Sequence, residues 1–168
     1  MNKKNGFTLV ELLVVIAIIA VLAGAVLIAI NPVEMMKKSR DAKRLSDLDQ
    51  LVRAMHLGLV EGEVTLKALA ATGNSFDDSQ VVNGTGWIKY DIPTATPVKT
   101  GLGKYIPTLP VDPLNTDGVS VYSFASTATD FEIDAVLEST DNDTKEAMDG
   151  GNKPAAYEVG TNLTLMAP

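Results

Sequence analysis

An almost uninterrupted apolar run near the N-terminus constrains this chain more than any other feature. From Phe7 to Ile30 every residue is apolar or small except Thr8 and Glu11. As an α-helix these 24 residues would be about 36 Å long, at ~1.5 Å per residue. The hydrocarbon core of a bilayer is about 30 Å thick. The run therefore predicts a transmembrane helix.

A secretory signal peptide is one alternative, with Lys3 and Lys4 as its basic region and Ala23-Gly24-Ala25 as its cleavage site. A plain single-pass anchor is another, and the length argues against a helix buried in a soluble core. Against the signal peptide, the apolar run continues to Ile30. A signal peptide also has no need for the carboxylate of Glu11 inside its apolar block.

Glu11 is informative because a carboxylate in a membrane segment is costly and usually has a partner. If the chain were cut after Gly6, a free amine would appear at Phe7. This cation at the membrane face could pair with Glu11 of a neighbouring subunit, where the low dielectric strengthens the attraction.

The residues Gly6-Phe7-Thr8-Leu9-Val10-Glu11, followed by an apolar segment, resemble the N-terminal motif of type IV prepilins and type II secretion pseudopilins. The resemblance implies cleavage between Gly6 and Phe7 by a prepilin peptidase of the inner membrane. It further implies N-methylation of Phe7 and a role for Glu11 in docking and filament assembly.

A structural function follows from this resemblance. It implies a homo-oligomeric helical filament at the cell surface, built with minor pilins and the pilus assembly machinery, from subunits held in the inner membrane with the head outside the cytoplasm. A major pseudopilin of a type II secretion system and a DNA-uptake pilin are alternatives within the family. A membrane-tethered binding domain without processing is a further alternative. The expected divisions are a leader (1–6), an apolar helix (7–31), an amphipathic stem (32–72) and a head (73–168).

The stem has an apolar stripe at helical spacing, which we expect to pack on the head. Pro32 is expected to end or kink the preceding helix. Residues 64–71 predict a second short helix, and His56 is expected to be a partly buried or surface residue. The stripe is Leu45, Leu48, Val52, Met55 and Leu59, and the other faces carry Lys43, Asp47, Asp49 and Arg53.

Residues 37–44 form a basic cluster that outweighs Lys3 and Lys4. A count of positive charges alone would place the following domain in the cytoplasm, whereas the resemblance requires it outside. We follow the motif because it is more specific. The cluster is expected to pair with acidic surfaces of neighbouring subunits, or else to contact anionic lipid headgroups or remain a solvated face.

The rest of the chain has the texture of strands and loops. Residues 119–124 and 131–138 alternate between apolar and polar side chains, and residues 127–130 predict the turn of a hairpin between them. Tyr157 and Val159 are expected in an edge strand, and residues 87–92 in a strand or a packed loop. Together with the helices this predicts an α+β fold, with a small antiparallel sheet facing the stem.

Residues 139–153 are acidic, and hard cations bind several oxygen ligands from flexible loops. Major pseudopilins carry a calcium ion in a comparable C-terminal loop, so the resemblance suggests one here. The candidate ligands are Asp141, Asp143, Asp149 and Asn152, although their spacing does not match an EF-hand. A solvated acidic loop is the alternative.

Composition argues against other functions. The chain has no cysteine and one histidine, which excludes thiolate chemistry and a multi-histidine zinc site. The net charge of −7 is opposite to that of a typical nucleic-acid-binding domain. We find no nucleophile–base pair and no phosphate-binding loop, so an enzyme is not expected.

Overall fold

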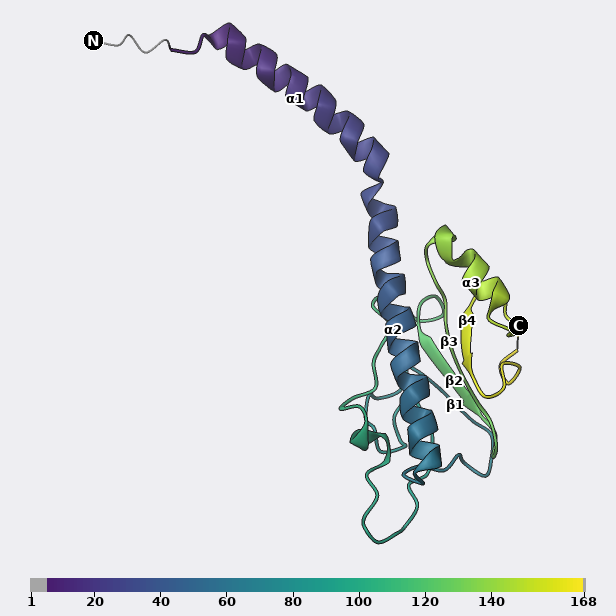
Figure 1. Ribbon diagram of the computed structural model, residues 1–168. Coiled ribbons are helices and arrows are strands. Elements are labelled where there is room, and N and C mark those ends of the chain that lie inside the picture. Colours follow the sequence, from purple (N-terminus) through teal and green to yellow (C-terminus); the bar gives the residue numbers. More distant parts are fainter. Residues whose placement is uncertain (1–5, 168) are drawn as a thin grey trace. The chain divides into compact units, whose positions relative to one another are not determined.

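Two helices follow one another at the start of the computed structural model, which describes residues 6–167 apart from the side chains of residues 28 and 29 (Figure 1). The described chain forms two units, one ending at Lys37 and the other beginning at Lys38. The predicted leader lies outside the described residues except for Gly6. The division into leader, apolar helix, stem and head stays a prediction.

Helix α1 (Leu9–Ile30) is capped by Thr8 and ends at Asn31, which has left-handed backbone angles (φ 45°, ψ 74°). Helix α2 (Pro32–Val60) begins at the next residue, where proline costs no hydrogen bond because the first helical N–H groups lack partners. The Asn31 carbonyl accepts hydrogen bonds from the backbone N–H groups of Glu34 and Met35. The predicted end or kink at Pro32 is therefore a break between two helices, and Asn31 alone separates them.

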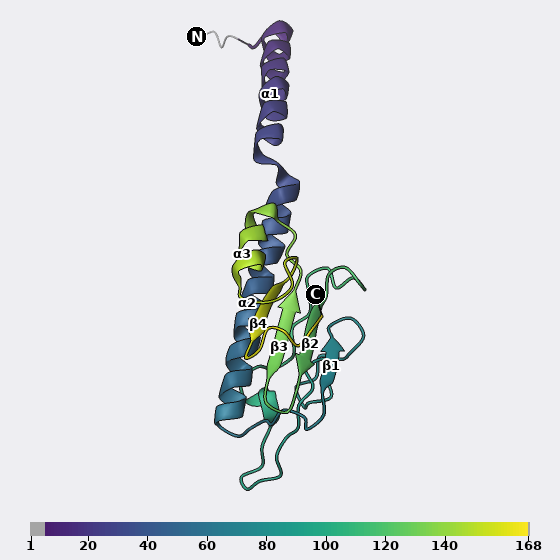
Figure 2. The same cartoon turned by 90° about the vertical axis from the view of Figure 1, so that its right-hand side faces the viewer.

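From Lys38 onward α2 belongs to the second unit and packs one face against the sheet (Figure 2). Leu48 and Met55 of the predicted stripe are fully buried, whereas Val52 and Leu59 are only partly buried. Leu51, which the stripe omitted, is also fully buried. The buried face is thus rotated slightly from the predicted one.

Four antiparallel strands form the sheet in the order β1-β2-β3-β4, and this confirms the α+β fold. The register pairs Phe124 with Ile133 in the central hairpin, and the Thr127 N–H donates to the Asp130 carbonyl in its turn (2.8 Å). The predicted hairpin and edge strand are therefore confirmed. The strands are β1 (Ala71–Asn74), β2 (Tyr122–Ser126), β3 (Phe131–Ala135) and β4 (Tyr157–Gly160).

The remaining elements are short. They are the 3₁₀ helices η1 (Gly101–Lys104) and η2 (Thr140–Asn142) and helix α3 (Asp143–Met148). Residues 87–92 form a packed loop, in which the buried Trp87 donates its indole N–H to the Pro110 carbonyl (2.9 Å).

The predicted helix at 64–71 is wrong. Thr65 instead forms an isolated antiparallel bridge with Asp91, and β1 begins at Ala71. Gly62 has a positive φ of 64° just beyond the end of α2, a conformation typical of a chain leaving a helix. The local helix propensity of this segment is thus overridden by pairing with a distant part of the chain.

The outer face of the sheet is less solvated than its alternating pattern predicts. Glu132, Asp134 and Glu158 are all nearly or completely buried. The C-terminal segment covers this face, because the N–H groups of Leu165 and Met166 donate to the Glu132 carboxylate at 2.6 and 3.0 Å.

Candidate processing and assembly site

The start of α1 is organised by a reciprocal pair of side chains. The Glu11 carboxylate accepts hydrogen bonds from the backbone N–H and the hydroxyl of Thr8, both at 2.9 Å. The Thr8 hydroxyl oxygen in turn accepts the Glu11 N–H at 3.2 Å. This capping box satisfies helix N–H groups and places the carboxylate at the positive end of the helix dipole.

The two residues predicted to flank the cleavage point, Gly6 and Phe7, precede the helix and are exposed. The Phe7 side chain is 85% exposed. The structure therefore places Gly6, Phe7 and Glu11 within one short, accessible segment, in which only Glu11 belongs to α1.

The apolar side chains of α1 are not buried over Leu9–Leu27. Among the described residues, this is the one stretch of helix long and apolar enough to cross a membrane. A continuous apolar surface of this size marks a site of contact with lipid or with other protein. The helix is consistent with membrane anchoring before assembly.

Basic residues of the stem form ion pairs with carboxylates of their own chain. Arg44 is completely buried, and its Nε and Nη2 atoms donate to the two Asp112 oxygens at 2.5 and 2.9 Å. Its Nη1 atom lies 2.9 Å from Asp41 and 2.6 Å from Glu138. Arg40 donates to both Glu138 oxygens at 2.8 and 2.5 Å.

Asp41 connects this cluster to the segment that follows β3. Its carboxylate accepts the backbone N–H groups of Glu138 and Ser139, each at 2.9 Å, and the side-chain amide of Asn142 at 2.8 Å. Burial alone would raise the pKa of Asp41, but these hydrogen bonds outweigh it and lower that pKa. The hydrogen bonds from Arg40, opposed by burial and reinforced by Arg44, lower the pKa of Glu138 to about 2.

These contacts give the basic cluster carboxylate partners in its own chain. Its pairing with neighbouring subunits or lipid headgroups stays a prediction, and the burial of Arg44 excludes it for that residue. Arg44 is inaccessible, and Arg40 is held by Glu138. Lys38 and Lys43 lie 2.5 and 2.8 Å from carboxylates of their own chain, those of Asp141 and Asp47. The cluster is thus paired within its own subunit.

Asp47, which lies on another face than the predicted apolar stripe, is nevertheless buried. It is only 8% exposed and accepts a hydrogen bond from the buried Tyr122 hydroxyl at 2.9 Å. A sequence signal for these buried charges does exist, because Arg44 lies one helical turn before Leu48 on the buried face. Nothing comparable in the sequence identifies Asp112 as its partner.

The calcium site at Asp141, Asp143, Asp149 and Asn152 stays a prediction. Within residues 6–167, no group of three or more His, Cys, Asp or Glu side chains could hold a metal ion. Asp141 is paired with Lys38, and both Asp149 oxygens accept backbone N–H groups, those of Gly151 and Glu158. Asn152 donates to the Met166 carbonyl at 3.2 Å. The oxygens of Asp141 and Asp149 are engaged by their own chain, and Asp143 begins α3.

His56 is exposed, with its ring edge-on to Phe131 at 5.5 Å between centroids. This agrees with the expected surface position.

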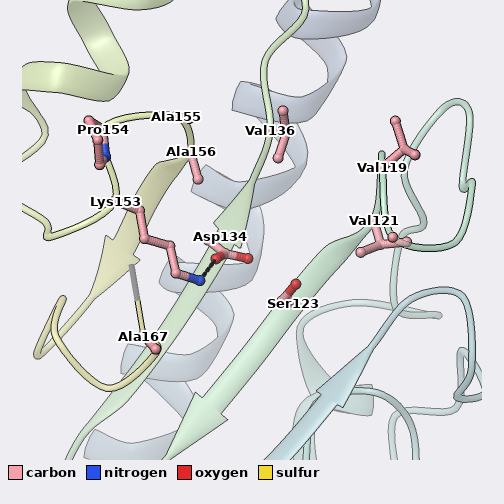
Figure 3. A pocket seen from close by; sticks show the side chains of 11 residues that line it. Val119, Val121, Ser123, Asp134, Val136, Lys153, Pro154, Ala155, Ala156 and Ala167 are labelled. Carbon is pink, nitrogen blue, oxygen red and sulfur yellow. Dashed lines mark hydrogen bonds and ion pairs between the residues drawn. The ribbon is translucent and has the colours of Figure 1, made fainter.

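A hollow of about 610 Å³ lies on the outer face of the sheet (Figure 3). Its walls are mainly apolar and include Val119, Val121 and Val136. Asp134 and Lys153 point toward each other in it and form an ion pair of 2.6 Å. Because these two charges neutralise each other, the hollow presents little chemistry beyond apolar contact.

In the comparison with known proteins, a family model matches the N-terminal segment of the chain. No curated protein and no solved structure matches the chain. Residues 1–27 match a family model described as the prokaryotic N-terminal methylation motif. Such motifs belong to structural, pilin-like proteins, which are not enzymes. The chain therefore carries, over residues 1–27, the prepilin-type signal of type IV pilins and pseudopilins.

Proposed function

We propose that this chain is a structural subunit of a type IV pilus-like surface filament. The chain is cleaved after Gly6, methylated at the new N-terminus of Phe7 and polymerised through its N-terminal helix. The head supplies the filament surface.

One observation carries the proposal. The methylation motif spans residues 1–27 and so includes most of α1, whose apolar side chains are exposed over Leu9–Leu27 and whose first turn carries Glu11. Removal of apolar surface from water contributes about 25 cal/mol per Å², so burial of α1 against other copies of α1 would drive assembly. Glu11 would pair with the Phe7 amine of a neighbouring subunit, which neutralises both charges in an apolar environment.

This function implies an order of locations and partners. The subunit waits in the inner membrane with its head outside the cytoplasm, meets the prepilin peptidase there, and enters a filament through the assembly machinery and minor pilins. The filament then lies at the cell surface. A major pseudopilin of a type II secretion system is the second candidate, because the same motif serves that class.

Mass spectrometry of the N-terminal peptide tests the proposal, on filaments sheared from cells and on the membrane fraction. Methylated Phe7 as the first residue of sheared material is the expected result. Methylated Phe7 in membranes alone would favour the pseudopilin. A chain that starts near Val26, or that keeps Met1, would contradict both.

A further inference from the structure

The charges of the head are almost completely paired within the subunit, and the few exceptions are informative. Among the lysines and arginines of residues 6–167, eleven form ion pairs and only Lys145 forms none. Lys145 is exposed on α3. A cation left without a partner is available to a group outside the subunit.

Few carboxylates are unpaired either. Over the described part of the chain, only Asp117 and Asp143 have side chains without a hydrogen bond or an ion pair. Asp143 lies two residues before Lys145 on α3, and residues two apart on a helix do not face each other. Asp117 is therefore the unpaired carboxylate that lies away from α3.

Lys145 borders a groove of about 360 Å³ between α2 and α3. Ala42 and the half-buried Leu45 give the groove an apolar part. Its other charges are Lys38 and Asp141, which pair with each other at 2.5 Å. The groove therefore combines apolar surface with one uncompensated positive charge.

Asp117 lies in a tight turn of different character. The backbone N–H and carbonyl groups of Thr116 and Ser120 exchange two hydrogen bonds of 2.9 Å. The side chain of Asn115 fixes the base of the turn to Ser75, at 2.7 and 3.2 Å. Such a preorganised turn loses little conformational freedom on binding.

The turn also carries apolar surface beside its charge. Leu114 is 48% exposed and Val119 is 64% exposed, and Figure 3 shows Val119 beside the outer face of the sheet. An acidic tip flanked by apolar side chains complements a groove that combines an apolar part with one unpaired lysine, Lys145. The turn contributes no residue to the groove, so the two surfaces are separate patches of one subunit.

We propose that the Asp117 turn of one subunit docks into the Lys145 groove of a second copy of this chain. Two different patches that bind each other make a heterologous contact, which gives a ring where the rotation closes and an open helical polymer where it does not. A filament needs the open form. This inference rests on the proposed function, because a chain that does not polymerise has no neighbouring copy to contact.

Chemical crosslinking tests the contact, since the chain has no cysteine and any thiol is an introduced one. The full-length variant Asp117→Cys/Lys145→Cys is produced in cells that assemble the polymer and treated with a short bis-maleimide. A spacer is needed because an ion-paired Lys and Asp can hold their Cα atoms farther apart than the ~7 Å limit of a disulfide. We expect a ladder of linked subunits.

Two controls sharpen this result. Each single cysteine variant should give no crosslinked subunits, because a heterologous contact brings together the two different positions and not two copies of one. The pair Asp77→Cys/Lys145→Cys joins Lys145 to another exposed carboxylate position and should give no ladder. A ladder from a single variant, or equal linking in the Asp77 pair, would overturn the contact.

Charge exchange gives an independent measurement. Lys145→Glu and Asp117→Lys should each lower filament yield severalfold, and the two together should restore it. If wild-type filaments with methylated Phe7 form but neither the ladder nor the rescue is seen, the contact is wrong while the proposed function stands. If the wild-type chain forms no polymer, both are overturned.

Discussion

Arg44 holds both carboxylate oxygens of Asp112 across 68 residues of sequence, and both side chains are completely removed from solvent. The pair joins the start of the stem in the second unit to the loop before β2. A buried ion pair of this kind contributes little net stability over an apolar pair, but removal of Asp112 leaves the Nε and Nη2 donors of Arg44 buried without their acceptors, while Asp41 and Glu138 still contact Nη1. The stability of the head should therefore depend strongly on each member.

We expect Asp112→Ala to lower the free energy of unfolding by about 3–5 kcal/mol, because it leaves the Arg44 charge buried without its bidentate partner. The fluorescence of Trp87, the only tryptophan and a fully buried one, reports unfolding in urea of the detergent-solubilised chain. Asp49→Ala is the matched control, since it removes the exposed partner of Arg53. Equal effects of the two variants would contradict the role given to Asp112.

The same cluster predicts a dependence on pH. Arg40 and Arg44 lower the pKa of Glu138 from an ordinary value of 4.5 to about 2. A group whose pKa is lower in the folded state stabilises it above the ordinary pKa, and this contribution is lost as the pH falls toward the folded value. Stability should therefore drop between pH 4.5 and pH 2. Glu138→Gln should flatten this part of the profile, and an unchanged slope in that variant would argue against Glu138 as its source.

Glu11 should be required for assembly but not for the fold of the head. We expect Glu11→Ala to reduce filament yield to a small fraction while leaving the Trp87 unfolding curve unchanged. Glu11→Gln separates two roles, because a glutamine can still accept the Thr8 N–H but carries no charge. Filament yield from Glu11→Gln should also fall, and a wild-type yield would show that capping rather than charge pairing is what assembly needs.

Two leucines of α2 test the position of its buried face. Leu48 is fully buried, whereas Leu57 is 48% exposed. Leu48→Ala should cost about 2–5 kcal/mol of unfolding free energy because it removes core contacts and leaves a cavity. Leu57→Ala should cost about 0.5 kcal/mol, as expected of a surface position. Comparable losses, measured by urea unfolding, would contradict this orientation of the helix.

The sequence predicted those parts of the fold that depend on local periodicity. The hairpin of β2 and β3 was found because the alternation of Tyr122 and Phe124, and then of Phe131 and Ile133, reflects one buried face. Where a distant segment decides the conformation, local pattern failed. Residues 64–71 have helical propensity, but Thr65 pairs with Asp91, 26 residues away.

The partners of charged residues in the candidate site also could not be predicted from local sequence pattern. The position of Arg44 one turn before Leu48 indicates the buried face of α2. The sequence does not, however, reveal Asp112, Glu138 or Tyr122 as the partners of Asp41, Arg44 and Asp47. The processing motif was identifiable because its residues are contiguous. The predicted calcium ligands depend on a resemblance in position and composition, and in the structure Asp141 pairs with Lys38 while Asp149 accepts backbone N–H groups.

The capping box at the start of α1 has a consequence for proteolysis. A peptide bond inside an α-helix must be unwound before it can adopt the extended shape that a protease active site binds. Thr8 caps the N-terminus of α1, which begins at Leu9. The peptide bond between Gly6 and Phe7 therefore lies outside the helix. The proposed scission therefore needs no unwinding of α1, and the cut leaves the helix and its Thr8–Glu11 cap intact.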